Sequence, residues 1–264
     1  MTPILLLGAG RMGGALISGW TKAGAFTPSD LIIVDPAAPP EARAAGAAGA
    51  QLNPPDKVLA QAQTVLLAVK PQMWKAAAEA YAPLLAPDAV VVSIAAGVGA
   101  GPIGEAFGGR PVARVMPTTG AAIGMGTASI YAASEVARAR AHSLFAPVGM
   151  VVDLDDEALM HAATAVSGSS PAYLYAFIEA LEAAGARAGL APDAARALAR
   201  STITGAAALL AQSGEDPAEL RRQVTSPGGT TQAALDVLMG EAGFGPLLDR
   251  AVAAAVARSK ELGG

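Results

Sequence analysis

The chain has 264 residues, enough for one or two domains with a sizeable core, and its net charge is −4 without any basic block. This charge argues against nucleic acid as a partner. The absence of cysteine excludes disulfides, thiol nucleophiles and zinc–thiolate sites, and neither histidine belongs to a recognisable set of metal ligands. We therefore expect a cytoplasmic protein without a metal centre.

The first informative stretch runs from Ile4 to Trp20, where an apolar strand leads into a glycine turn and then a helix. In this arrangement a helix N-terminus directs its free N–H groups at a pyrophosphate. Gly8 allows the tight turn, Gly10 lets the backbone approach the phosphates, and Gly13 lets helix and strand pack closely. The alternative is a glycine-rich turn that binds nothing. The position between strand and helix favours the dinucleotide site.

The first half of the chain alternates short apolar runs with helical stretches, which is typical of βαβ units and a mostly parallel, Rossmann-type sheet. Strands are expected at 4–7, 31–34, 50–52, 64–69, 89–94, 111–115, 127–131 and 150–152, and helices at 41–48, 73–85 and 135–145. A further short helix is expected to end at Ala60, with Asn53 as its N-cap. Two stretches without charge, 89–104 and 115–134, are interrupted by Gly, Pro, Ser or Thr, so we expect no contact with a membrane.

From Asp155 onward the periodicity is helical only. Helices are expected at 172–188, 192–212, from Pro217, at 230–239 and at 246–261, with Ser167–Pro171 as a helix start and Gly189 as a C-terminal cap. We place the domain boundary between 155 and 156, which gives a dinucleotide-binding domain at 1–155 and an all-helical domain at 156–264. The helical part is rich in alanine, which permits close packing, and a second copy of the chain could complete its core, so we expect a homodimer.

Ligands of open α/β sheets bind outside the carboxyl ends of the strands. Asp35 ends a strand 22 residues beyond Gly13, a distance suited to hydrogen bonds with the adenosine ribose. A carboxylate there repels a 2′-phosphate, which favours NADH over NADPH, although the nearby Arg43 weakens this preference. The alternative is a carboxylate that only caps a turn. Lys70-Pro71 follows another strand, either as a polar wall beside the nicotinamide ribose or as a surface lysine before a helix.

The remaining titratable residues favour structural interpretations. His142 and His161 lie in helical stretches and are expected to be structural residues. The acidic run from Asp153 to Glu157 is expected to be a solvated helix start, stabilised by the helix dipole.

A second glycine-containing loop, 223–231, contains hydroxyl side chains but no charged residue, and it opens directly onto a helix. Successive backbone N–H groups, a helix N-terminus and nearby hydroxyls suit a small anion such as a carboxylate. The alternative is a helix-capping turn without a ligand. Two anion sites in one chain, one for a pyrophosphate and one for a carboxylate, favour a redox enzyme.

Six segments, taken in order, resemble the pyrroline-5-carboxylate reductase family. They are GAGRMG at 8–13, AVKPQ at 68–72, SIAAGV at 93–98, RVMP at 114–117, SGSSPAY at 167–173 and VTSPGGTT at 224–231. The resemblance implies reduction of 1-pyrroline-5-carboxylate to L-proline by NADH or NADPH, the last step of proline synthesis. It also implies a Rossmann-type domain, a helical dimerisation domain and often a larger ring of dimers.

The resemblance also implies the site residues. The cofactor would be bound by Gly8, Ala9, Gly10, Arg11, Met12, Gly13, Asp35, Asn53, Val69, Lys70, Pro71 and Ala96. The substrate, a cyclic imino acid, would be bound by Ser226, Gly228, Gly229, Thr230 and Thr231, with Glu157 approaching it as well. Thr231 would be the catalytic residue, near the imine nitrogen.

The chain departs from the family pattern in three places. Thr118-Thr119-Gly120 replaces the usual Asn-Thr-Pro, His161 stands where Asp is common, and Gln223 where Asn is common. The first change replaces an amide near the nicotinamide with a hydroxyl.

The chemistry needs little from the protein's side chains, because a partly protonated imine accepts hydride at carbon without a strong general acid. Two other classes fit the glycine turn. A β-hydroxyacid dehydrogenase usually needs a lysine in its second domain, where this chain has only Lys260 near its end. Another imine reductase with the same glycine turn is an alternative beside the dehydrogenase. A non-enzymatic dinucleotide sensor would have no reason to keep the 224–231 loop.

Overall fold

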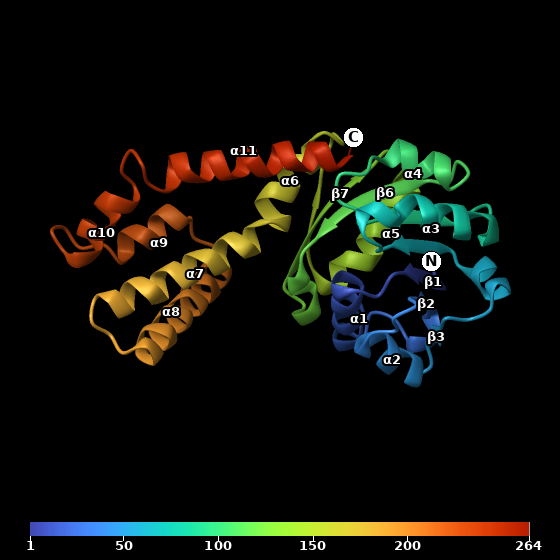
Figure 1. Ribbon diagram of the computed structural model, residues 1–264, viewed down its shortest axis with the longest axis horizontal. Coiled ribbons are helices and arrows are strands. Elements are labelled where there is room, and N and C mark those ends of the chain that lie inside the picture. The colour runs from blue at the N-terminus through green and yellow to red at the C-terminus, as the bar shows by residue number, and fades with distance from the viewer. Residues whose placement is uncertain (264) are drawn as a thin grey trace. The chain divides into compact units, whose positions relative to one another are not determined.

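The computed structural model describes residues 1–263 (Figure 1). The chain divides into two compact units. One unit comprises Met1–Gly168 and the end of the chain from Ala255, and the other comprises Ser169–Ala254. The expected boundary between 155 and 156 stays a prediction.

The first unit is built on an eight-stranded sheet with the order β3-β2-β1-β4-β5-β6-β7-β8. Its strands are β1 Ile4–Leu7, β2 Leu31–Val34, β3 Gln51–Leu52, β4 Thr64–Leu67, β5 Val90–Ser93, β6 Val112–Pro117, β7 Gly126–Ala132 and β8 Gly149–Asp153. Only the β6–β7 pair is antiparallel among the described pairs. This order confirms the Rossmann-type sheet. The strand order reverses between β1 and β4, where such folds bind their ligands.

Helices cover both faces of this sheet (Figure 1). They are α1 Arg11–Ala23, α2 Pro40–Ala47, α3 Trp74–Tyr81, α4 Ala100–Ala106, α5 Glu135–Phe145 and α6 Leu159–Ala163. Ile4 and Leu6 of β1 face the core that contains Trp20, whereas Leu5 and Leu7 face the core that contains Phe107. A strand inside a parallel sheet has both faces buried, so nearly all of its residues are apolar. This is why β1 and β2 are continuous apolar runs in the sequence.

The second unit is helical, as expected. It contains α7 Ser170–Arg187, α8 Pro192–Ser213, α9 Pro217–Gln223, α10 Thr230–Leu238 and the first part of α11, Phe244–Gly263. Phe177 of α7 meets Phe244 of α11 edge to face, with ring centroids 6.0 Å apart. Many large apolar side chains of this unit stay exposed in the single chain, among them Leu198, Leu209 and Val237.

Three local predictions were wrong, and one helix was missed. The segment Asp56–Gln61 is a 3₁₀ helix, and Asn53 does not cap it but adopts a left-handed conformation. The expected helix 73–85 is α3 with a 3₁₀ turn at each end, where Pro71 and Pro83 lie. A π-helical turn, Thr164–Gly168, precedes α7, and no serine side chain caps that helix at Ser169. Helix α4 was missed because its sequence, AGPIGEA, has few helix formers.

Candidate active site

The glycine turn lies at the carboxyl end of β1, at the point where strand order reverses. Gly8 has a φ of +93°, and a Cβ atom on Gly13 would come within 2.4 Å of the Gly8 carbonyl oxygen. A Cβ atom on Gly10 would meet open space. Helix α1 begins immediately afterwards without a side-chain cap or an acidic residue in its first turn. Its first N–H groups are therefore available to an anion.

The Asp35 carboxylate lies beside this turn. Its Oδ2 atom accepts a hydrogen bond from the Ala9 N–H at 2.7 Å, and its Oδ1 atom accepts one from the Ala37 N–H at 2.8 Å. Asn53 holds the backbone of Asp35 on both sides, because its Oδ1 accepts from the Asp35 N–H and its Nδ2 donates to the Asp35 carbonyl oxygen. The ends of β1, β2 and β3 are thereby joined, and three of the predicted cofactor residues lie together.

The ends of β4 and β5 continue the same edge of the sheet. The Ala68 N–H donates to the Leu7 carbonyl oxygen, and a Cβ atom on Gly8 would come within 2.8 Å of the Ala68 oxygen, so Val69 follows a segment that touches the glycine turn. Lys70 is exposed. Pro71 and Gly99 line one cavity of about 360 Å³, which brings together the segments that follow β4 and β5.

The loop predicted to bind the substrate lies in the second unit. Gly228 is left-handed, with a φ of +69°, and Gly229 is the N-cap of α10, which has no side-chain cap and no acidic residue in its first turn. A Cβ atom on Gly229 would come within 2.5 Å of the Ser226 hydroxyl, so this hydroxyl lies against the start of the helix. Thr231 is half-buried in the first turn. The loop thus presents hydroxyls and free N–H groups together, as an anion site requires.

The unusual Thr118 has a structural role in the first unit. Its hydroxyl oxygen accepts a hydrogen bond from the Thr127 N–H at 2.9 Å, at the end of the β6–β7 pair.

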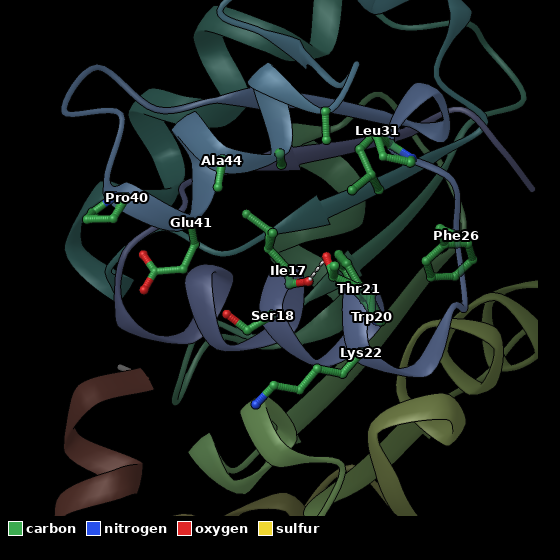
Figure 2. A pocket seen from close by; sticks show the side chains of 13 residues that line it. Ile17, Ser18, Trp20, Thr21, Lys22, Phe26, Leu31, Pro40, Glu41 and Ala44 are labelled. Atoms are coloured by element: carbon green, nitrogen blue, oxygen red, sulfur yellow. Dashed lines mark hydrogen bonds between the residues drawn. The ribbon is translucent and has the colours of Figure 1, made fainter.

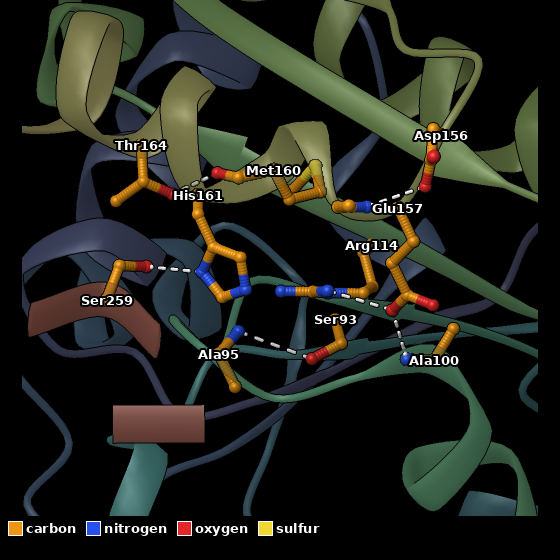
Figure 3. Close-up of polar contacts among 11 residues, drawn as sticks. Ser93, Ala95, Ala100, Arg114, Asp156, Glu157, Met160, His161, Thr164 and Ser259 are labelled. Carbon is orange, nitrogen blue, oxygen red and sulfur yellow. Dashed lines mark hydrogen bonds and ion pairs between the residues drawn. The ribbon is translucent and has the colours of Figure 1, made fainter. Parts of the chain in front are cut away.

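The acidic run from Asp153 to Glu157 is not simply solvated, which corrects the expectation. Asp153 pairs with Arg138 and with His142, each at 2.8 Å. Glu157 Oε1 accepts hydrogen bonds from the buried Arg114 at 2.8 Å and from the Ala100 N–H at 2.7 Å (Figure 3). Sequence reasoning missed the importance of Arg114. The available signal was a lone cation in an otherwise apolar strand, since a buried cation requires a partner.

His161 is a hydrogen-bonded residue, as expected, with Nδ1 3.0 Å from the Ser259 hydroxyl of α11 (Figure 3). Burial lowers the pKa of His161 below its usual value of 6.5, the positive charges of Arg114 and Lys260 lower it further, and the carboxylate of Glu157 opposes them. Below about pH 6.5 the unfolded chain therefore protonates this histidine more readily than the folded chain does.

We expect the free energy of unfolding to fall as the pH drops below about 6.5, because protonation of His161 then favours the unfolded chain. Urea denaturation of the wild type and of His161→Gln should be compared at pH 7.5 and at pH 5.5. The glutamine variant should lose less stability over this interval, whereas His142→Asn, which changes the other histidine, should retain the loss. An equal loss in wild type and His161→Gln would contradict this role.

Another cavity, of about 550 Å³, lies elsewhere in the first unit, between α1, the start of β2 and α2 (Figure 2). Trp20, Phe26 and Leu31 line its apolar part, and Lys22 and Glu41 lie at its polar parts. None of the predicted cofactor residues lines it within the described part of the chain.

Over residues 1–263, no group of three or more His, Cys, Asp or Glu is placed to hold a metal ion. In the same range, no helix has the length and apolar character needed to cross a bilayer.

A parallel sheet with an uncapped helix after its glycine turn, and an acid bonded to that turn, defines a dinucleotide-dependent oxidoreductase. The family described as NADP oxidoreductase, coenzyme F420-dependent, matches residues 3–97, and the pyrroline-5-carboxylate reductase dimerisation family matches residues 157–262. The pyrroline-5-carboxylate reductase of Pseudomonas aeruginosa is 41% identical over 98% of this chain and 96% of its own. The pyrroline-5-carboxylate reductase of Pisum sativum is 38% identical over 97% of this chain and 94% of its own. The chain belongs to the pyrroline-5-carboxylate reductase family.

Solved structures agree with this assignment. A pyrroline-5-carboxylate reductase from Coxiella burnetii has a TM-score of 0.90 at 29% identity and covers 100% of this chain and 99% of that one. The Plasmodium falciparum pyrroline carboxylate reductase, with NADP bound, has a TM-score of 0.85 at 26% identity and covers 100% of this chain and 98% of that one. A Mycobacterium tuberculosis 3-hydroxyisobutyrate dehydrogenase shares the fold alone, at 16% identity and a TM-score of 0.53, with 98% and 94% covered.

The protein therefore reduces 1-pyrroline-5-carboxylate to proline with a nicotinamide dinucleotide, NAD(P)H, as the hydride donor, and it is a homo-oligomer. The uncovered apolar side chains of the second unit suit this assembly, since the matched family is a dimerisation domain.

Proposed function

We propose that the reaction uses NADH bound along the carboxyl edge of the sheet in the first unit. The cofactor contacts in this proposal are Gly8, Ala9, Gly10, Arg11, Met12, Gly13, Asp35, Asn53, Val69, Lys70, Pro71 and Ala96. The observation that carries it is the hydrogen bond from the Ala9 N–H to the Asp35 carboxylate, at 2.7 Å. This contact fixes a negative charge between the pyrophosphate turn and the end of β2, where the adenosine ribose binds in Rossmann folds.

The substrate carboxylate, in this proposal, binds the loop before α10. Its proposed contacts are Ser226, Gly228, Gly229, Thr230 and Thr231, through their hydroxyls and the N–H groups at the start of α10. The Gly229 N–H itself donates to the Ser226 carbonyl oxygen at 3.0 Å, which closes the turn. The Thr231 hydroxyl lies near the imine nitrogen and stabilises the charge there while hydride is transferred to the neighbouring carbon. Because the imine is already partly protonated, no strong general acid is needed. Glu157 has different surroundings, which point to another role.

Replacement of Asp35 with serine tests the cofactor assignment. We expect the ratio of kcat/KM for NADPH to that for NADH to rise roughly tenfold, because loss of the carboxylate removes its repulsion of the 2′-phosphate. The absolute kcat/KM should fall with both cofactors, since one hydroxyl cannot replace a carboxylate that accepts from the N–H groups of Ala9, Ala37 and Ala38.

The measurement is oxidation of each cofactor with 1-pyrroline-5-carboxylate as substrate. Asp35→Asn removes the charge but keeps an acceptor, so it should shift the ratio with a smaller loss of absolute rate. Asp56→Ser, an exposed acid beyond Asn53, is the control that should leave the ratio unchanged. An unaltered ratio in both Asp35 variants would refute the ribose assignment, and a wild type that prefers NADPH would refute the choice of NADH.

We further propose that the dimers assemble into a larger ring, that the enzyme acts in the cytoplasm, and that the functional boundary lies between 155 and 156. The ring and the location rest on the family resemblance and on the biosynthetic reaction. The boundary is supported by the dimerisation match, which begins at 157. Sedimentation of the purified protein distinguishes a dimer from a ring.

A further inference from the structure

The side chain of Arg114, the only charged residue of β6, is almost fully buried, with 6% of its surface exposed. Its Nη1 atom donates to Glu157 Oε1 at 2.8 Å, and the same oxygen accepts the Ala100 N–H at 2.7 Å. One carboxylate oxygen therefore connects β6 to the first residue of α4 (Figure 3). Hydrogen bonds to ionised groups are among the stronger ones in proteins, so this is a firm attachment.

The attachment holds one end of the segment Ile94–Gly99, which connects β5 to α4. The other end is held by the sheet, because the Ile94 N–H donates to the Leu67 carbonyl oxygen at 3.1 Å and the Ala95 N–H to the Ser93 hydroxyl at 3.2 Å. Ala96, a proposed cofactor contact, lies between the two attachments. Gly97 next to it is left-handed, with a φ of +80°. Glu157 is thus bonded to the residue that directly follows the segment containing Ala96.

The surroundings of Glu157 argue against direct substrate binding. Its side chain is one-third exposed, at 32%, but Oε1 is already shared by two donors. The carboxylate also compensates the buried charge of Arg114, which would otherwise be costly. A carboxylate would in addition repel the carboxylate of the substrate.

We propose that Glu157, oriented by Arg114, is a positioning residue that sets the Ile94–Gly99 segment for the nicotinamide half of the cofactor. This inference rests on the proposed contact between Ala96 and the cofactor. Glu157 touches neither cofactor nor substrate in this arrangement and acts through the Ala100 N–H.

Glu157→Gln tests the inference in the full-length protein. Calorimetric titration with NADH, in the absence of substrate, should give a Kd raised roughly tenfold, because Arg114 is left without its counter-charge and the segment loosens. The KM for 1-pyrroline-5-carboxylate at saturating NADH should stay within about twofold of the wild type, as expected for a group that makes no substrate contact. Asp155→Asn, a nearby exposed acid, is the matched control and should change neither value.

The double variant Arg114→Gln, Glu157→Gln leaves no buried charge and keeps an amide oxygen for the Ala100 N–H. It should recover most of the NADH affinity, a rescue that also separates positioning from a failure to fold. If Glu157→Gln raises the KM for 1-pyrroline-5-carboxylate but leaves the Kd for NADH unchanged, Glu157 is a substrate contact and the inference is overturned. Wild-type values of both constants in this variant would also overturn the inference. Ala96→Leu tests the underlying cofactor site: if it binds NADH as the wild type does, that contact fails independently of Glu157.

Discussion

Replacing Thr231 with alanine is expected to lower kcat/KM for 1-pyrroline-5-carboxylate by about 10- to 1000-fold, the range found when one positioned polar group is lost. Thr231 lies in the first turn of α10, directly after a loop without charged side chains. The proposed loop contacts include no strong acid, so the Thr231 hydroxyl is the group that stabilises the charge at the imine nitrogen. Its removal should lower kcat, because that charge changes as hydride is transferred.

The matched variants separate the hydroxyl from the methyl group of the same side chain. Thr231→Ser keeps the hydroxyl and should retain most of the activity, whereas Thr231→Val keeps the shape and should behave like the alanine variant. Steady-state kinetics with saturating NADH give the measurement, and NADH affinity without substrate should be equal in all three. An unchanged kcat/KM in Thr231→Ala and Thr231→Val would remove Thr231 from the catalytic site.

The parts of the fold that follow from local sequence were predictable. Strands β1, β2 and β4, the glycine turn and the position of Asp35 all rest on patterns within about 30 residues, the length of a βαβ unit. The parallel sheet follows from their repetition. The prediction that the chain after the sheet is helical was equally secure, because apolar residues recur there at helical spacing.

The remaining features depend on contacts between distant segments. Asn53 was expected to cap a helix. Instead, its side-chain amide forms hydrogen bonds with the backbone of Asp35, 18 residues earlier, and its own backbone is left-handed. The Glu157 carboxylate, expected in a solvated run, is bound by Arg114 and Ala100, 43 and 57 residues away. No local pattern specifies such pairs, since the folded sheet alone determines which side chains meet.

Replacing Gly13 with alanine is expected to weaken NADH binding by about 100-fold and to destabilise the first unit by about 1–3 kcal/mol, the cost of forcing an extra methyl group into a packed core. The new Cβ atom would lie 2.4 Å from the Gly8 carbonyl oxygen and 3.2 Å from its carbonyl carbon, so α1 must move away from β1. The displacement misplaces the N–H groups at the start of α1, which are the proposed pyrophosphate contacts.

Gly10→Ala separates the two effects of Gly13→Ala, because a Cβ atom at position 10 meets no protein atom within 4 Å. It should keep the wild-type Tm but still weaken NADH binding, since the methyl group occupies the space through which the phosphates approach. Gly13→Ala should lower both the Tm and the affinity for NADH, with the Tm falling by about 2–4 °C for each kcal/mol of stability lost. The measurements are thermal unfolding and calorimetric titration with NADH. Wild-type affinity in Gly10→Ala would place the pyrophosphate elsewhere, whereas loss of affinity at an unchanged Tm assigns the Gly10 position to the phosphates.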